Sequence, residues 1–141
     1  MILYLDTSSL VKPYLNEAGG DIVRSQADQA DLVAMSIVAY PEARATFARR
    51  LREGLLTEAE YETVLGDFER DWEQRSSIDV TMAVARAAGE LAEKHALRGF
   101  DAIHLASALE LQARVQTRVT FSSADVRLAT AAQAEGLEGL Q

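Results

Sequence analysis

The chain has 141 residues, of which 48% are hydrophobic and 26% charged, and this composition fits one folded domain over residues 1–141. It contains no cysteine, which excludes disulfides, thiolate zinc sites and cysteine nucleophiles. With only two histidines, any metal site is expected to use oxygen ligands, which suit magnesium or manganese. The net charge of −8, taken alone, argues against nucleic-acid binding.

Short apolar runs alternate with helical patterns along the chain. The runs predict strands at residues 2–5, 32–35, 78–80, 119–121 and 137–140. Helices are expected at residues 8–15, 21–30, 36–53, 57–75, 81–95, 101–111 and 125–135. This alternation predicts an α/β domain in which helices cover both faces of a mostly parallel sheet.

Several helix starts carry local signals. Ser8 or Ser9 is expected to cap the first helix, and Thr81 a later one. Thr57 and Glu60 form a capping box pattern, which predicts that a helix opens there. Pro41 leaves two alternatives for its segment, because proline is tolerated only at a helix start: the regular helix begins at Pro41, or its first turn is bent.

Four acidic residues are candidates for a site, and two of them stand where this fold class places chemistry. Asp6 ends the first strand directly, and Asp125 follows the strand at 119–121 by a few residues, so both lie at carboxyl ends of strands. Asp101 begins a mostly apolar helix, and Glu42 lies near the start of another. Each acid alone can be a helix cap or a solvated charge. Converging carboxylates repel one another, and a divalent cation removes that repulsion.

Four segments together resemble PIN domains, and in particular the VapC-type toxins of bacterial toxin–antitoxin pairs. The segments are LDTSSLVKPYL, SIVAYPEA, RGFDAIHLASAL and TFSSADVRLATAAQAEGL, and they cover nearly the whole chain in the family's order. The resemblance implies a three-layer α/β/α fold with a central, mostly parallel sheet. It also implies a magnesium-dependent endoribonuclease, with manganese as an alternative ion, that cleaves RNA with a metal-activated water.

The resemblance assigns roles to individual residues. The catalytic acids are Asp6, Glu42, Asp101 and Asp125. Asp6 and Asp101 are the expected metal ligands, whereas Asp125 is either a ligand or only the cap of its helix. The residues expected to support the acids are Ser8, Ser123 and His104. We expect His104, one turn after Asp101, to orient a carboxylate or to pack rather than to bind metal.

Charge is distributed unevenly over an expected pair of antiparallel helices. Arginines cluster at residues 44–52 and acids at 58–73. One interpretation is that salt bridges join the two helices. The other is that the arginines form an RNA path and the acidic helix faces a basic antitoxin or a second subunit. The candidates for RNA binding are Lys12, Arg44 and Arg98. Aromatic residues of the acidic helix, by their helical spacing, are expected in a core or interface: Tyr61, Phe68 and Trp72.

The resemblance further implies an RNA substrate, an antitoxin partner and a homodimer. The first residues contain no basic leader or long apolar run, so we expect a cytoplasmic protein without a membrane segment. Two alternatives stay open: a catalytically weak PIN-fold interaction module, and a housekeeping RNA-processing nuclease. A phosphatase of the haloacid dehalogenase type is disfavoured, because Ser8 stands where its second aspartate is needed.

Overall fold

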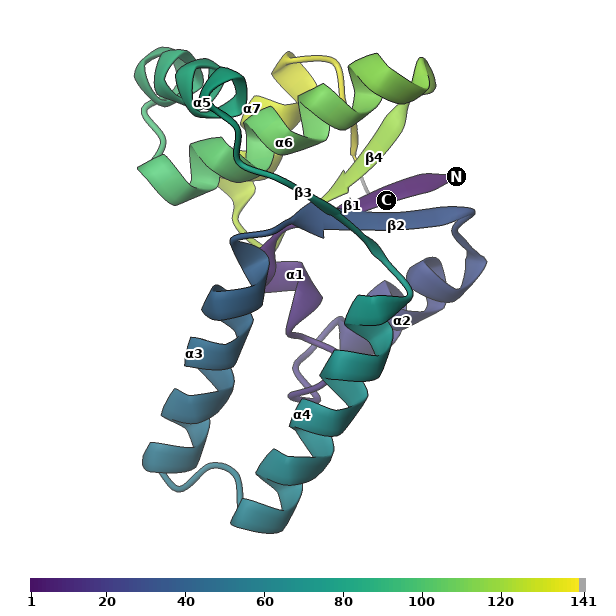
Figure 1. Ribbon diagram of the computed structural model, residues 1–141, viewed down its shortest axis with the longest axis vertical. Helices are drawn as coiled ribbons and strands as arrows, with labels where there is room; N and C mark the ends of the chain where they lie inside the picture. Colours follow the sequence, from purple (N-terminus) through teal and green to yellow (C-terminus); the bar gives the residue numbers. More distant parts are fainter. Residues whose placement is uncertain (140–141) are drawn as a thin grey trace.

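A computed structural model describes residues 1–139. Its centre is a sheet of five strands: β1 (Ile2–Leu5), β2 (Leu32–Ser36), β3 (Ser76–Ile78), β4 (Val119–Ser122) and β5 (Glu138–Gly139). The strand order is β3-β2-β1-β4-β5, and each neighbouring pair is parallel (Figure 1). The parallel sheet confirms the predicted α/β class.

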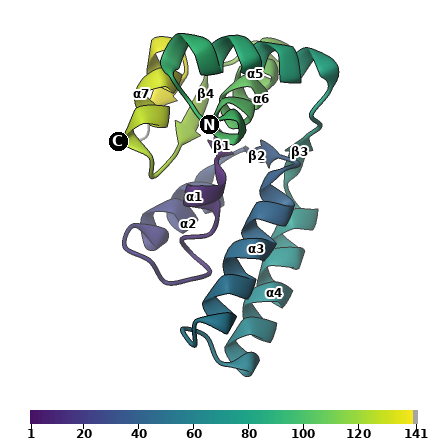
Figure 2. The same ribbon diagram turned by 90° about the vertical axis from the view of Figure 1, so that its left-hand side faces the viewer.

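Within the described residues, seven helices cover the sheet on its two faces (Figures 1 and 2). One face packs against α1 (Thr7–Leu10), α2 (Gly20–Gln29), α3 (Ala39–Arg52) and α4 (Glu58–Glu73). The other packs against α5 (Met82–His95), α6 (Gly99–Val115) and α7 (Val126–Ala134). The predicted three layers are therefore confirmed. Within residues 1–139, no helix combines the length and the hydropathy that crossing a bilayer requires.

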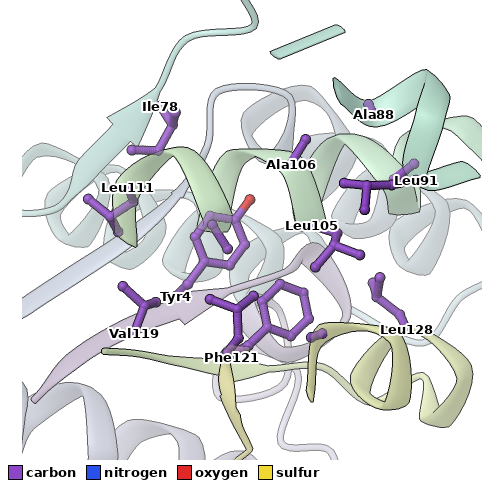
Figure 3. Packing of buried hydrophobic residues seen from close by; sticks show 14 of the residues in the cluster. Tyr4, Ile78, Ala88, Leu91, Leu105, Ala106, Leu111, Val119, Phe121 and Leu128 are labelled. Carbon is purple, nitrogen blue, oxygen red and sulfur yellow. The ribbon is translucent and has the colours of Figure 1, made fainter. Parts of the chain in front are cut away.

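Strand β1 is buried on both faces, because helices lie on both sides of it. Leu3 and Leu5 contact the α1–α4 layer, and Tyr4 contacts the α5–α7 layer, as the alternation of side chains along a strand requires. Figure 3 shows the Tyr4 ring beside Phe121 and Val119 of β4, under α6. The end of β1, where Asp6 follows, is thus held firmly in the core.

Helices α3 and α4 form an antiparallel hairpin that extends away from the sheet (Figures 1 and 2). Phe47 of α3 and Phe68 of α4 are fully buried between them, with ring centroids 5.4 Å apart. An ion pair of 3.4 Å between Arg44 and Glu69 also joins the two helices. The predicted helix pair, its salt bridge and the packing role of Phe68 are confirmed.

Some predicted boundaries need correction. Helix α1 is capped by Asp6 rather than by Ser8 or Ser9, because the Asp6 carboxylate accepts a hydrogen bond from the Ser9 amide. Helix α3 begins at Ala39, so Pro41 lies in the first turn, where backbone N–H groups have no intrahelical acceptor.

Strand and helix ends near the sheet also shift. The third strand ends at Ile78 instead of Val80, because the chain then leaves the sheet and Thr81 caps α5. Helix α6 starts two residues before Asp101, at Gly99. The last predicted strand is present as Glu138–Gly139, at the sheet edge; its predicted end at Leu140 lies outside the described residues.

Candidate active site

The four predicted acids line one cleft at the carboxyl edge of the sheet. Asp6 follows β1, Asp125 follows β4, Asp101 lies in the first turn of α6, and Glu42 lies in the first turn of α3. The cleft has a volume of about 400 Å³. Its other lining residues are Thr7, Ser8, Val11, Thr46, Arg49, Arg98 and His104. The fold thus brings together carboxylates that are far apart in the sequence.

Asp6 is the most buried of these acids, with 4% of its surface exposed. Its Oδ1 accepts hydrogen bonds from the Ser9 amide at 3.0 Å and the Ser8 hydroxyl at 2.6 Å, and its Oδ2 accepts one from the Ser123 hydroxyl. Within residues 1–139, no cationic side chain pairs with Asp6. Neutral donors alone hold this buried charge, so a cation in the cleft would be strongly favoured.

Serine hydroxyls connect the loop after β4 to the start of α1. Ser123 Oγ accepts from the Asp125 amide at 3.0 Å, and Ser8 Oγ accepts from the Ala124 amide at 2.9 Å. Both serines also donate to Asp6. The geometry therefore agrees with the supporting roles expected of Ser8 and Ser123.

Glu42 is held by a chain of hydrogen bonds that runs into the core. Its Oε1 accepts from Thr7 Oγ1 at 2.7 Å and from His104 Nε2 at 2.9 Å. His104 Nδ1 lies 3.1 Å from the hydroxyl of Tyr4. Because a carboxylate only accepts, His104 must donate from Nε2, and in the neutral ring Tyr4 then donates to Nδ1.

This chain keeps Glu42 ionised. Partial burial acts to raise the pKa of Glu42, but the hydrogen bonds from His104 and Thr7 outweigh it, so the pKa lies below its ordinary value. Burial raises the pKa of Tyr4 well above its ordinary value, so its hydroxyl stays protonated as a donor. Both ring nitrogens of His104 have hydrogen-bond partners, and the carboxylate that its Nε2 contacts is Glu42.

For Asp101, the effects that raise the pKa outweigh those that lower it. Burial raises its pKa above the ordinary value, against an opposing effect of Arg98, whose Nε lies 3.6 Å from Asp101 Oδ2. The negative charges of Asp125 and Asp6 raise the pKa of Asp101 further. Mutual repulsion among three neighbouring acids is the electrostatic pattern that a bound cation relieves.

Asp125 combines a cap with a place in the cleft. Its Oδ1 accepts hydrogen bonds from the Arg127 amide at 2.9 Å and the Leu128 amide at 3.3 Å, which makes it the N-cap of α7. Its Oδ2 has no hydrogen-bond partner among the described residues. One oxygen is therefore structural, and the other is available to a ligand.

Of the predicted RNA-binding residues, the structure brings Arg98 to the cleft. Lys12 and Arg44 are not among the lining residues, and Arg44 instead donates a hydrogen bond of 2.9 Å to the hydroxyl of Tyr40. Arg49, which belongs to the arginine cluster expected to form an RNA path, does line the cleft, although it was not singled out as a candidate. Its spacing of seven residues from Glu42 along one helix is the signal that would have indicated it.

The acids suit a hydrated divalent ion. Within residues 1–139, no three acidic or histidine side chains lie close enough together to ligate one ion. Magnesium does not require such a cluster, because it keeps several waters and commonly binds through one or two carboxylates and the substrate phosphate. The oxygen-only donors Asp6 and Asp101 fit this chemistry, and the cleft has room for the waters.

Comparison with known proteins identifies the family. A family model described as the PIN domain matches residues 3–134. Two curated relatives from Mycobacterium tuberculosis are each 40% identical over 139 residues: Ribonuclease VapC45 from strain CDC 1551 and Ribonuclease VapC49 from strain H37Rv. Each alignment covers 96% of this chain and 92% of the relative. The match across nearly the whole chain shows that this protein belongs to the PIN domain family.

Proposed function

We propose that this chain is a magnesium-dependent endoribonuclease and the toxin of a type II toxin–antitoxin system. The observation that carries the proposal is the convergence of four carboxylates, from four separate elements, on one cleft at the carboxyl edge of the sheet. Membership of the PIN domain family and two relatives named as VapC ribonucleases support it.

In this proposal Asp6 and Asp101 hold the divalent ion, which is magnesium or manganese. When bound, the ion supplies an activated water and stabilises the charge that develops at the scissile phosphate. Glu42, kept ionised by His104 and Thr7, accepts a proton from water in the cleft. Hydrolysis then leaves a 5′-phosphate and a 3′-hydroxyl, without a covalent bond to the protein.

The net charge of −8 is compatible with an RNA substrate, because charge at the cleft matters more than the total. Arg49 and Arg98 both line the cleft beside the acids. A bound divalent ion would add two further positive charges. The site as loaded would therefore attract phosphate, although the rest of the surface is acidic.

We further propose that a cognate antitoxin covers this cleft and that two copies of the chain associate in the cytoplasm. The names of the two VapC relatives and the absence of cysteine support this setting. Light scattering that finds only monomers at micromolar concentration would exclude the dimer without affecting the proposed chemistry.

Expression in a bacterial host tests the function directly. The unmodified chain should arrest growth and produce RNA fragments with 5′-phosphates, and Asp101→Asn should relieve the arrest because it removes a proposed metal ligand. Equal arrest by Asp101→Asn would show that toxicity does not come from the cleft. Cleavage of RNA without arrest would favour a housekeeping nuclease, and tight partner binding without any cleavage would favour an interaction module.

A pair of substitutions separates the two roles of Asp125. Asparagine caps a helix as well as aspartate, so Asp125→Asn should change stability by less than about 1 kcal/mol while cleavage falls by about 10- to 100-fold. Asp125→Ala should lower cleavage similarly and also cost roughly 0.5–2 kcal/mol of stability. Thermal melts and cleavage rates in magnesium measure both effects. Full cleavage by Asp125→Asn would leave this residue with the cap alone.

A further inference from the structure

One face of α3 forms a wall of the acid cleft. Glu42, Thr46 and Arg49 follow one another at helical spacing, and all three line the cleft. The buried residues Ala43 and Phe47 point instead into the core. Arg49 therefore stands on the cleft wall two helical turns from Glu42, about 10 Å along the helix axis.

Arg49 differs from its neighbours in its contacts. Arg44 pairs with Glu69 at 3.4 Å, and Arg50 pairs with Glu17 at 2.7 Å. The Arg49 side chain is exposed and makes no ion pair or hydrogen bond with any residue of the described range 1–139. Its guanidinium is thus a cation on the cleft wall that takes part in none of the polar contacts of the described residues.

Arg98 provides a second cation from the other layer of the molecule. It stands at the start of α6, on the opposite face of the sheet from α3, and also lines the cleft. Its ion pair with Asp101 is weak, because the Arg98 side chain is 89% exposed. Arg98 can therefore leave Asp101 for another anion at little cost.

We propose that Arg49 and Arg98 bind two backbone phosphates of single-stranded RNA, one on each side of the phosphate that is cleaved. This inference rests on the proposed ribonuclease function. Arginine suits the task, because its planar guanidinium donates two parallel hydrogen bonds to a phosphate. A cleft of about 400 Å³ suits an unpaired strand rather than a duplex, and the strand would cross it with the scissile phosphate between the two arginines and over the acids.

The salt dependence of RNA binding reports the number of these phosphate contacts. Binding of a fluorescent single-stranded oligoribonucleotide is measured in EDTA, which prevents cleavage, over a range of salt concentrations. For single strands, each lost phosphate contact should reduce the slope of log K against log salt by about 0.7. We expect that reduction in Arg49→Gln and in Arg98→Gln, twice as much in the double variant, and none in Arg49→Lys.

A matched control separates local contacts from total charge. Arg114 pairs with Glu110 at 3.1 Å and lies 13 residues after Asp101, about 20 Å along the same helix and beyond the Debye length. Arg114→Gln should leave the slope unchanged. Cleavage in magnesium gives a second readout, in which Arg49→Gln and Arg98→Gln both raise KM, and Arg49→Gln, which does not touch an acid, leaves kcat unchanged.

The outcomes distinguish this inference from the function on which it rests. If the unmodified chain cleaves RNA but neither arginine variant changes the slope or KM, the inference is wrong. An equal effect of Arg114→Gln would also overturn it, because net charge would then explain the result. A chain that neither binds nor cleaves RNA would overturn the proposed ribonuclease function itself.

Discussion

Asp6→Asn is expected to lower RNA cleavage by at least about 100- to 1,000-fold while the protein stays folded. The substitution removes the most buried negative charge of the cleft, so divalent-ion binding is lost with it. Asparagine remains a good cap and can still accept the hydrogen bond from the Ser9 amide. Stability should change by less than about 1 kcal/mol, or rise, because repulsion of Asp101 falls.

Three measurements check this expectation: cleavage rates of a labelled RNA in magnesium, calorimetric titration with manganese, and thermal melts. Asp21→Asn is the matched control, because Asp21 is an exposed acid in the first turn of α2 and lies outside the cleft. It should cleave RNA and bind manganese like the unmodified chain. If Asp6→Asn also did so, Asp6 would not belong to the site, and the proposed mechanism would fail.

The local part of the fold could be predicted from the sequence. The capping box of Thr57 and Glu60 forms as expected, and Thr81 caps α5. The apolar run before Asp6 forms a strand with the predicted bounds. These signals are readable because each depends on residues within one turn or one strand. Parallel pairing then brings Asp6 and the loop before Asp125 to one edge, as the fold class requires.

The hydrogen-bond partners in the site could not be predicted, because they join distant segments. His104 is 62 residues from Glu42 and 100 from Tyr4, and the helical pattern around His104 indicates only a mostly apolar helix. The buried bond between the hydroxyls of Ser122 and Ser9 spans 113 residues. Such contacts arise from tertiary packing, which residue spacing does not encode.

Which arginine of α3 lines the cleft could not be predicted for a different physical reason. The sequence shows a cluster of positive charge, but its distribution around a helix depends on where and how the helix begins. Pro41 left that start open between two alternatives. Once α3 is seen to run regularly from Ala39, its period places Arg49 on the face of Glu42 and turns Arg44 toward Glu69.

Phe68→Ala is expected to destabilise the protein by about 3–5 kcal/mol. Phe68 is fully buried in α4, and its ring lies 5.4 Å from that of Phe47 and 5.7 Å from those of Tyr14, Tyr40 and Trp72. Truncation therefore opens a cavity among four aromatic rings, which cannot easily close around it. For a chain of this length the melting temperature should fall by roughly 10–15 °C.

Phe100→Ala makes the same chemical change on the surface, because Phe100 is 59% exposed at the start of α6. It should alter stability by no more than about 0.5 kcal/mol. Urea unfolding of both variants measures the two changes in free energy directly. Comparable losses in Phe68→Ala and Phe100→Ala would mean that the aromatic cluster does not hold α4 against α3. Other contacts would then have to hold α3 in place, and Glu42 and Arg49 with it.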